Sequence, residues 1–324
     1  MDKRVKRIGV LTSGGDAPGM NAAIRAVVLT AQHLRIDCIG IRRGYNGLIC
    51  GDMVPLAAED VNGIERWGGT ILYTARSPDF MTEAGLRRAA ENCRFRGLDG
   101  LVIIGGDGSF KGALELSKLG IPVIGIPGTI DNDIGCTTYT IGFDTACNTA
   151  TDAVDKLEDT MQSHERCSVV EVMGHRSGHL ALNVGISVGA TVTIIPEMEI
   201  DFEKDVADRI RMARPKGHTH FTVVVAEGAA SAHTIAEKIR QTIGIETRVT
   251  TLGHIQRGGS PLVRDRVTAA RMGYKAVSLL AAGVFNRVVC MSGEKCVAYD
   301  IEKALKMTKG LDEDACNMQD ALMS

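Results

Sequence analysis

Short apolar runs alternate with longer segments of helical period along nearly the whole chain. Runs rich in Val, Ile and Leu predict the strands Arg7–Thr12, Asp37–Ile41, Leu101–Ile104, Val123–Ile126, Ser168–Val172, Thr191–Ile195, Phe221–Ala226 and Val288–Met291. Apolar residues at helical spacing predict the helices Asn21–Leu34, Leu86–Arg96, Phe110–Leu119, Thr145–Gln162, Phe202–Arg214, Ser231–Thr242 and Val263–Leu280. Because strands alternate with helices, we expect right-handed βαβ units and mostly parallel sheets.

The length of 324 residues suits two domains of ordinary size. A turn-rich stretch, Thr138–Asp144, precedes the long helix that begins near Thr145 and is the candidate boundary. The stretch Leu180–Pro196 is uncharged but too short and polar for a membrane span, so we expect a buried helix followed by a strand there. The predicted fold is α/β, with two doubly wound, Rossmann-like domains and a cleft between them.

Composition narrows the class of protein. The 37 Lys and Arg residues against 39 Asp and Glu give a net charge of −2, which disfavours nucleic acid as the main partner. Glycine is abundant, with 37 residues, and only 4% of residues are aromatic. An aliphatic core with many glycines is typical of α/β proteins, whose buried strands are Val/Ile/Leu-rich and whose turns need glycine.

Cysteine usage points to a reducing compartment. The nine cysteines are an odd number with no CxxC spacing, so neither a full set of disulfides nor a zinc site is indicated. The charged N-terminal residues lead into the first strand without an apolar segment between them. We therefore expect a cytoplasmic protein with no membrane partner.

The first candidate site is the turn Thr12-Ser13-Gly14-Gly15-Asp16, between a predicted strand and the helix after it. Glycines at such a turn let backbone N–H groups approach an anion, and the helix N-terminus adds a partial positive charge. A tight strand-to-helix turn that needs positive φ would explain the same residues equally well.

A second turn, Gly105-Gly106-Asp107-Gly108-Ser109, follows the Leu101–Ile104 strand. In doubly wound sheets ligands bind at the carboxyl ends of strands, where an Asp can hold Mg²⁺ and the adjacent amides can face phosphate oxygens. A helix N-cap would explain Ser109 or Asp107 but not the flanking glycines. The chain has no GxxxxGK[ST] motif, and neither turn matches GxGxxG.

The third segment is Pro127-Gly128-Thr129-Ile130-Asp131-Asn132-Asp133, directly after the Val123–Ile126 strand. Two carboxylates at i and i+2 point the same way on an extended backbone, which suits one as base and one as metal-associated acid. Surface Asx-turns are the alternative. We expect the three turns to lie on adjacent strands.

Together these segments resemble the bacterial-type ATP-dependent 6-phosphofructokinases. Further matching segments are Thr74–Phe80, Val169–Gly174, Ala226-Glu227-Gly228 and Leu252–Pro261. The resemblance implies a glycolytic kinase that transfers a phosphoryl group from MgATP to the 1-hydroxyl of fructose 6-phosphate, as a homotetramer. It implies a larger ATP-binding domain, 1–142 plus 256–306, and a smaller sugar-phosphate domain, 143–255 plus 307–324.

The resemblance also carries residue roles over by position. Asp131 would be the base that takes the proton of the 1-hydroxyl, and Asp107 would bind Mg²⁺. The implied catalytic residues are Asp131, Thr129, Asp133, Arg76 and His175. The implied ATP site consists of Gly15, Tyr45, Arg76, Ser77, Gly106, Asp107, Gly108, Ser109 and Gly112. The implied substrate site consists of Thr129, Ile130, Asp131, Arg166, Met173, Gly174, His175, Glu227, Arg248, His254, Ile255, Gln256 and Arg257. Arg166 and Arg248 would come from a neighbouring subunit.

The donor can also be inferred from the resemblance. Pyrophosphate-using relatives usually carry Asp where this chain has Gly108 and Lys where it has Gly128, so the glycine pair favours ATP. Met81 stands where some relatives place an arginine near the adenine, which leaves ATP against GTP open.

Two departures from the family pattern stand out. His175, followed by Arg176, replaces the usual arginine, so a fixed positive charge near the transferred phosphoryl would be missing. Of the basic cluster that binds allosteric effectors in relatives, only Arg25 and Lys216 remain. The other positions of that site hold Leu29, Ala58, Gly63, Glu158, Thr191 and His218. We expect slower transfer or looser substrate binding, and little control by ADP or phosphoenolpyruvate.

Two rival functions stay open at this point. A kinase that shares the GGDG turn but acts on NAD or a lipid would lack the GHIQRGGSP segment, which is present here. A catalytically weakened paralogue that binds sugar phosphate or serves as a regulatory subunit is supported by His175 and the altered effector cluster.

Overall fold

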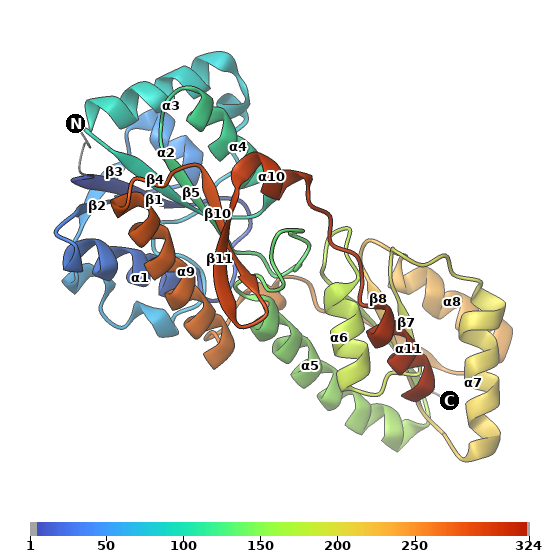
Figure 1. The fold of residues 1–324 in the computed structure, drawn as a ribbon. Coiled ribbons are helices and arrows are strands. Elements are labelled where there is room, and N and C mark those ends of the chain that lie inside the picture. The colour runs from blue at the N-terminus through green and yellow to red at the C-terminus, as the bar shows by residue number, and fades with distance from the viewer. Residues whose placement is uncertain (1–4, 323–324) are drawn as a thin grey trace. The chain divides into compact units, whose positions relative to one another are not determined.

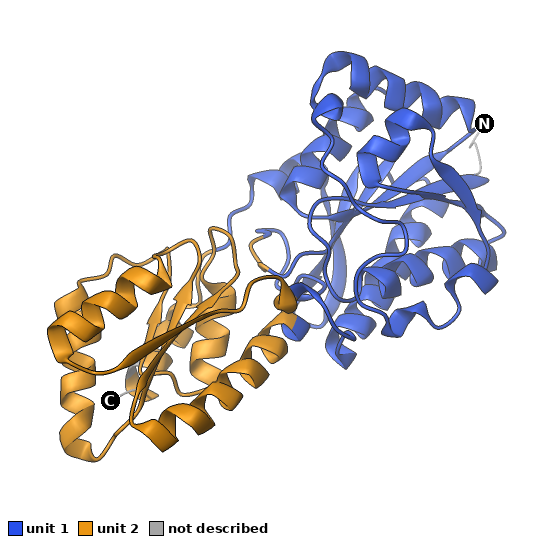
Figure 2. Cartoon of the chain, turned by 180° about the vertical axis from the view of Figure 1, so that it is seen from behind, with its two compact units in different colours: residues 1–130, 134–145, 257–309 blue, residues 131–133, 146–256, 310–324 orange. Residues whose placement is uncertain are grey.

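The computed structural model describes residues 5–322 and divides the chain into two compact units (Figure 2). Unit 1 consists of Met1–Ile130, Ile134–Thr145 and Arg257–Lys309. Unit 2 consists of Asp131–Asp133, Ala146–Gln256 and Gly310–Ser324. Strands and helices alternate in both units, so the predicted α/β fold class is confirmed.

Unit 1 is built on a seven-stranded sheet of order β11-β10-β5-β4-β1-β2-β3. The strands are β1 (Arg7–Thr12), β2 (Asp37–Ile41), β3 (Met53–Leu56), β4 (Gly100–Gly105), β5 (Val123–Pro127), β10 (Arg287–Ser292) and β11 (Lys295–Asp300). The five inner strands are parallel, and β3 and β11 add to the two edges in antiparallel orientation. Every residue of β4 and β5 is buried, because helices cover both faces of the sheet.

The helices of unit 1 lie in two layers. The α-helices are α1 (Met20–His33), α2 (Gly44–Cys50), α3 (Glu83–Phe95), α4 (Asp107–Lys118), α9 (Val263–Ala281) and α10 (Ile301–Lys306), with short 3₁₀ turns at Glu59–Val61, Ile64–Arg66 and Pro78–Met81. Helices α1 and α9 pack together on one face, and α2, α3, α4 and α10 cover the other (Figure 1). The apolar side chains between α2, α3, α4 and the sheet form one core that includes Leu11, Leu101 and Phe110.

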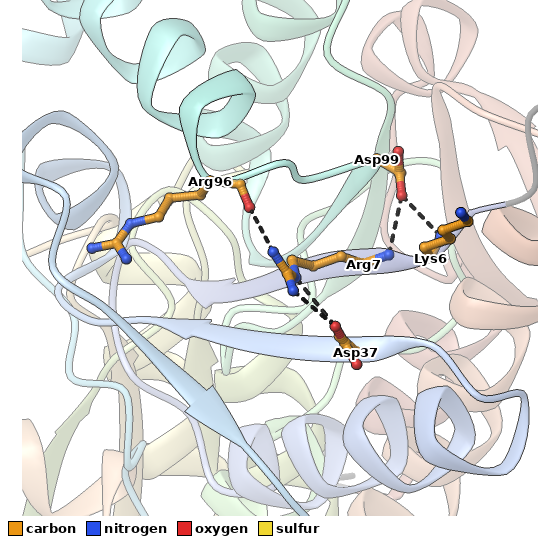
Figure 3. Close-up of polar contacts among 5 residues, drawn as sticks. All are labelled: Lys6, Arg7, Asp37, Arg96 and Asp99. Atoms are coloured by element: carbon orange, nitrogen blue, oxygen red, sulfur yellow. Dashed lines mark hydrogen bonds and ion pairs between the residues drawn. The ribbon is translucent and has the colours of Figure 1, made fainter.

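The amino ends of the central strands are joined by charged side chains (Figure 3). The Asp99 carboxylate accepts hydrogen bonds from the backbone N–H groups of Lys6 at 2.8 Å and Arg7 at 3.1 Å. The Arg7 guanidinium donates to Asp37 at 2.9 Å and to the carbonyl of Arg96 at 3.2 Å. These contacts lie at the end of the sheet opposite to the glycine-rich turns, so we assign them to stability.

Unit 2 has a four-stranded parallel sheet of order β7-β8-β6-β9. Its strands are β6 (Cys167–Val172), β7 (Val192–Ile194), β8 (Phe221–Ala226) and β9 (Thr247–Thr251). Its helices are α6 (His179–Ser187), α7 (Asp208–Ala213), α8 (Ala232–Ile243) and α11 (Glu313–Leu322), with 3₁₀ turns at Arg214–Lys216 and Gly253–Arg257. Helices α6 and α11 lie on one face and α7 and α8 on the other (Figure 1). The helix predicted over Phe202–Arg214 begins instead with a π-helical segment, Phe202–Ala207, which continues into α7.

The long helix α5 (Phe143–His164) begins in unit 1 and continues into unit 2. Its first turn is held by Asp265 of α9, whose side chain is fully buried. Asp265 accepts hydrogen bonds from the hydroxyl of Tyr139 at 2.7 Å, from the N–H of Gly142 at 2.6 Å and from both the N–H and the hydroxyl of Thr145. One buried carboxylate thus accepts from two backbone N–H groups at the start of this helix, those of Gly142 and Thr145. Among residues 5–322, no helix is both long and apolar enough to span a bilayer.

Candidate active site

The three glycine-rich turns follow β1, β4 and β5, which are direct neighbours in the sheet. Backbone hydrogen bonds join the turns: Ser13 N–H donates to the carbonyl of Ile104 at 2.9 Å, and Gly128 N–H donates to the carbonyl of Gly105 at 3.0 Å. The hydroxyl of Ser109 donates to the carbonyl of Ser13 at 3.1 Å. The structure therefore places all three turns at one edge of the sheet, as the sequence predicts.

The turn between β4 and α4 has one packed glycine and two open ones. A Cβ on Gly105 would lie 2.4 Å from both the Ser109 hydroxyl and the Ser13 carbonyl oxygen, so only glycine fits. A Cβ on Gly106 or Gly108 would meet no atom within 4 Å. Asp107, between them, is exposed and begins α4, which has no side-chain N-cap. The helix N-terminus therefore faces open space with a carboxylate beside it, a setting suited to phosphate and a cation.

The turn after β1 has the tight geometry that one of its two explanations requires. Gly14 has φ 88°, which is the left-handed conformation expected of a tight turn. A Cβ on Gly15 would lie 2.6 Å from a guanidinium nitrogen of Arg257, which donates to the carbonyl of Asp16 at 3.0 Å. Backbone geometry thus favours glycine at position 14, whereas a larger residue at position 15 would displace the end of the Arg257 side chain. The structure brings Arg257, a predicted substrate residue, onto the predicted ATP turn.

The remaining predicted ATP residues form two groups, one in the core beside α4 and one on the segment next to the β1 turn. Tyr45 is buried, donates its hydroxyl to the Ser109 carbonyl and stacks on Phe80 with ring centroids 3.9 Å apart. A Cβ on Gly112 would lie 2.8 Å from the Tyr45 ring, so these residues support the helix from inside the core. Arg76 is exposed and Ser77 half-buried, on a segment tied to the β1 turn by the Thr74 hydroxyl, which donates to the Gly14 carbonyl at 2.6 Å.

The segment after β5 corrects one premise of the sequence argument. Asn132 has φ 51°, so the backbone turns between Asp131 and Asp133 rather than extending, and the i, i+2 rule for extended chains does not apply. Ile130 is fully buried and anchors the segment, and the Thr129 carbonyl accepts from the Thr140 hydroxyl at 2.7 Å. Asp131 is half-buried and Asp133 exposed. The two carboxylates therefore differ in environment.

In unit 2, predicted substrate residues gather at the carboxyl ends of β6, β8 and β9. The N–H of Met173 donates to the buried side chain of Gln256 at 3.2 Å, and the N–H of His175 donates to the Glu227 carboxylate at 2.9 Å. His175 has φ 55°, a conformation that costs most residues energy, and its side chain is exposed. Gly174, also at positive φ, precedes it.

Two neighbours complete this end of unit 2. The hydroxyl of Ser177, which the sequence argument missed, donates to the carbonyl of Asp131 at 3.3 Å and so fixes the backbone of the predicted base. The one signal in the sequence for Ser177 is its closeness to Gly174, a predicted substrate residue three positions earlier. His254 and Ile255 are both exposed on the 3₁₀ turn after β9.

Arg166 and Arg248 lie at the other end of the unit 2 sheet. Arg166 immediately precedes β6, and Arg248 is the second residue of β9, the strand paired with it. Both contact Glu246, whose carboxylate lies 2.9 Å from Arg166 and 2.6 Å from Arg248. The hydrogen bond to Arg166 holds the pKa of the Glu246 carboxyl below its usual value. The structure thus separates these arginines from Met173 and Glu227 by the length of the strand.

The two predicted effector residues lie on different units. Arg25 forms an ion pair with Glu65 at 3.1 Å within unit 1, and Lys216 ends the 3₁₀ turn in unit 2. Glu158, which replaces a basic residue of the family pattern, accepts a hydrogen bond from the hydroxyl of Thr222 at 2.9 Å.

Comparison with known proteins follows the same segments. The family model described as Phosphofructokinase matches residues 7–280. The chain is 52% identical over 310 residues to the ATP-dependent 6-phosphofructokinase of Clostridium botulinum, covering 96% of this chain and 97% of that protein. It is 51% identical, over the same shares of the two chains, to the ATP-dependent 6-phosphofructokinase of Clostridium novyi.

Solved structures show the same fold. The phosphofructokinase of Saccharomyces cerevisiae superposes with a TM-score of 0.88 at 34% identity, covering 98% of this chain. This chain spans 47% of the yeast chain. A pyrophosphate-dependent phosphofructokinase of Nitrosospira multiformis superposes with a TM-score of 0.88 at 19% identity, a likeness of fold.

Proposed function

This chain belongs to the phosphofructokinase family, and from that membership we infer that it is an ATP-dependent 6-phosphofructokinase. It transfers the γ-phosphoryl group of ATP to the 1-hydroxyl of fructose 6-phosphate, which gives fructose 1,6-bisphosphate and ADP. The observation that carries this inference is the identity to ATP-dependent relatives over nearly the full length of both chains. Glycolysis is therefore the process in which the enzyme acts.

The geometry of two glycines supports ATP over pyrophosphate. Open space around Gly108 leaves room for the α-phosphate of a nucleotide, which an Asp there would crowd and repel. A Cβ on Gly128 would lie 3.1 Å from Ile104 and 3.3 Å from Met20, so a lysine could not be added there without a shift of the core. Both positions therefore suit the nucleotide donor.

On the donor side, we propose that phosphates bind at the N-terminus of α4 and at the β1 turn, on Gly15, Gly106, Gly108 and Ser109. Arg76 lies on the segment tied to the β1 turn and would offset charge on the transferred group. Asp107 suits Mg²⁺, which proteins hold through one or two carboxylates together with the phosphates of the substrate. Bound there, Mg²⁺ would neutralise phosphate charge; Asp107 would position it beside the open glycines.

On the acceptor side, we propose that Asp131 accepts the proton of the 1-hydroxyl while Thr129 and Asp133 flank it. Carboxylates in this role orient the attacking hydroxyl, and positioning supplies most of the acceleration in phosphoryl transfer. Ser177 holds the Asp131 backbone, and the turn at Asn132 sets the direction of the segment. Met173, Gly174, His175 and Glu227 would contact the sugar.

The 6-phosphate would be bound by His254 and Arg257 and by Arg166 and Arg248 of a neighbouring copy. Arginine suits this role because its planar fork binds phosphate oxygens in pairs. Because Arg166 and Arg248 lie at the amino ends of their strands, a second copy must supply them if they serve the site near Met173. This supports an oligomer with active sites completed across an interface, and we propose the homotetramer that family membership implies.

Three further assignments are proposals of the same kind. Unit 1 serves as the ATP-binding domain and unit 2 as the sugar-phosphate domain. Among residues 5–322, which include all nine cysteines, no cysteine takes part in a disulfide, which supports the cytoplasm. The altered effector positions support little control by ADP or phosphoenolpyruvate.

One coupled assay tests the function. Purified protein is given fructose 6-phosphate with either ATP or pyrophosphate, and fructose 1,6-bisphosphate is measured. We expect turnover when ATP is the donor and none when pyrophosphate is. In Asp131→Asn we expect kcat to fall by about 10²–10⁴-fold, the range typical of general bases. A wild-type rate no higher than that of Asp131→Asn would favour the weakened paralogue, and turnover with pyrophosphate alone would overturn the donor assignment.

A further inference from the structure

Two buried cysteines of unit 1 face each other at the edge of the core. Cys290 lies on β10 and is fully buried, and Cys136 lies in the loop after the Asp131 segment with 5% of its surface exposed. Their Sγ atoms are 3.2 Å apart, with the Cys290 thiol donating to Cys136. Both belong to the apolar cluster around Phe110. A disulfide bond requires about 2.05 Å between sulfurs, so a shift of about 1 Å would join them.

Two hydrogen bonds between the residues that follow the cysteines hold the pair in this register. Thr138 N–H donates to the Met291 carbonyl at 2.9 Å, and Met291 N–H donates to the Thr137 hydroxyl at 2.9 Å. The residues that follow each cysteine are thus tied to each other. These contacts between the loop and β10 therefore hold the two cysteines next to each other.

We propose that Cys136 and Cys290 are an oxidisable dithiol pair, which a hydroperoxide converts reversibly to a disulfide. The peroxide supplies the oxidising equivalents. The Cys136 thiolate attacks one peroxide oxygen, the O–O bond breaks, and Cys136 becomes a sulfenic acid while hydroxide leaves and is protonated to water. The Cys290 sulfur then attacks the Cys136 sulfur, the S–O bond breaks and a second water leaves. Two thiols and one hydrogen peroxide thus give one disulfide and two waters.

The pair differs from the other buried thiols of the chain. Burial raises the pKa of Cys38, Cys93 and Cys167 to about 12, so these thiols stay protonated. The hydrogen bond from Cys290 lowers the pKa of Cys136 and raises that of Cys290. This assigns Cys136, the more accessible of the two, as the sulfur that is oxidised first.

The disulfide would restrain the loop that follows the predicted base. Cys136 is five residues after Asp131, and Gly135 between them already packs so tightly that a Cβ there would lie 2.1 Å from the Met307 carbonyl oxygen. Backbone displacement on forming the bond therefore passes toward Asp131. Misplacement of a reacting group by about 1 Å can cost about 10²-fold in rate. The effect on activity rests on the proposed function; formation of the disulfide does not.

The test uses the full-length enzyme, reduced and then treated with hydrogen peroxide. Free thiols are alkylated, the protein is digested without reduction, and peptides are mapped by mass spectrometry. We expect one linked pair of peptides that contains Cys136 and Cys290 and lacks the mass of two hydrogen atoms. The phosphofructokinase rate should fall about tenfold or more and return on treatment with dithiothreitol.

Three variants serve as controls. Cys290→Ser and Cys290→Ala should keep the basal rate and lose the reversible inactivation, and either one suffices if the other does not fold. Cys93→Ser removes a buried thiol of the same core and should behave as wild type. If peroxide treatment oxidises the exposed Cys50 but forms no disulfide between Cys136 and Cys290, the proposal is overturned. Reversible inactivation of Cys290→Ser equal to wild type would overturn the link to activity. If the wild type has no activity before oxidation, the proposed function fails, and the peptide map still decides the disulfide.

Discussion

The carboxylate of Glu246 lies 2.9 Å from the Nε atom of Arg166, the residue that precedes the neighbouring strand. Its other oxygen lies 2.6 Å from Arg248, so one acidic side chain contacts both arginines proposed to bind the sugar phosphate. Two guanidinium groups repel each other, and the shared carboxylate holds them together. The contacts occupy one nitrogen of each fork, Nε of Arg166 and one terminal nitrogen of Arg248. If the two arginines bind the sugar phosphate as proposed, we expect Glu246 to position them rather than to contact the ligand.

Replacing this carboxylate tests the role. We expect Glu246→Gln to raise KM for fructose 6-phosphate about threefold with kcat unchanged, in keeping with the modest strength of exposed ion pairs. Glu237→Gln, which breaks the exposed pair with Arg240 on α8, is the matched control and should leave KM unchanged. A lower KM in Glu246→Gln would mean that the carboxylate competes with phosphate instead.

Substitutions at two glycines of the β4–α4 turn should change stability in opposite directions. Gly108→Ala adds a methyl group to open space in a helix, so the free energy of unfolding should rise by about 0.5–1 kcal/mol while KM for ATP rises about tenfold. Gly105→Ala forces a methyl group against backbone and should lower thermal stability. Thermal denaturation and ATP saturation of both variants separate binding from folding. Unchanged ATP saturation in Gly108→Ala would place the phosphates elsewhere.

Position 175 holds a histidine where the family pattern has an arginine. His175→Arg should raise kcat or lower KM for fructose 6-phosphate severalfold, since a fixed positive charge would then stand near the transferred group. His175→Asn suits the left-handed backbone without adding charge and is the control. An arginine variant no faster and no tighter than the parent would remove this explanation for the substitution.

Asp265 should be the most costly carboxylate to remove from unit 1. Asp265→Ala leaves the buried donors of Tyr139, Gly142 and Thr145 without an acceptor, and we expect a loss of about 3–5 kcal/mol in the free energy of unfolding. Asp152→Ala, which breaks an exposed pair on α5, should cost less than about 0.5 kcal/mol. Urea denaturation measures both, and equal costs would contradict the assignment.

The same carboxyl has a pH signature. Burial raises the pKa of Asp265 above the usual value of an aspartate, despite the hydrogen bonds that lower it. A raised native pKa means that the folded state binds the proton more tightly than the unfolded state. The contribution of Asp265 to the free energy of unfolding is therefore fully present below the pKa of the unfolded state. It is lost as pH rises through the pKa of the folded state. Urea midpoints across this acid range should show that loss in the wild type and not in Asp265→Asn.

Sequence reasoning found the elements whose burial is unambiguous. Strands β1 and β4 read as continuous apolar runs because helices cover both of their faces, and their bounds were predicted to within one residue. The edge strands β3, β9 and β11 are missing from the predicted strands. All three are only partly buried; β9 and β11 mix polar with apolar residues, and β3 has only four residues, one of them a proline. Helix α2, which contains two glycines in seven residues, has too little helical propensity to be predicted.

The sequence predicts the separate segments of the candidate site but not the contacts that join them. Glycine-rich turns at strand ends carry their own signal. The turn at Asn132 depends on a backbone conformation that the sequence does not specify, and Glu246 is tied to Arg166 only by the pairing of β6 with β9. Contacts between residues far apart in the chain require the three-dimensional register.

Strand β9 is an edge of the unit 2 sheet and carries Arg248 among β-branched residues. An unpaired edge of this composition is a template for aggregation, and charged side chains are the usual protection against it. Charges on Arg248 and on the preceding Glu246 protect this edge in that way, whatever their part in binding the sugar phosphate. Variants that neutralise both should lose solubility, so kinetic studies of this arginine need a parallel check for self-association.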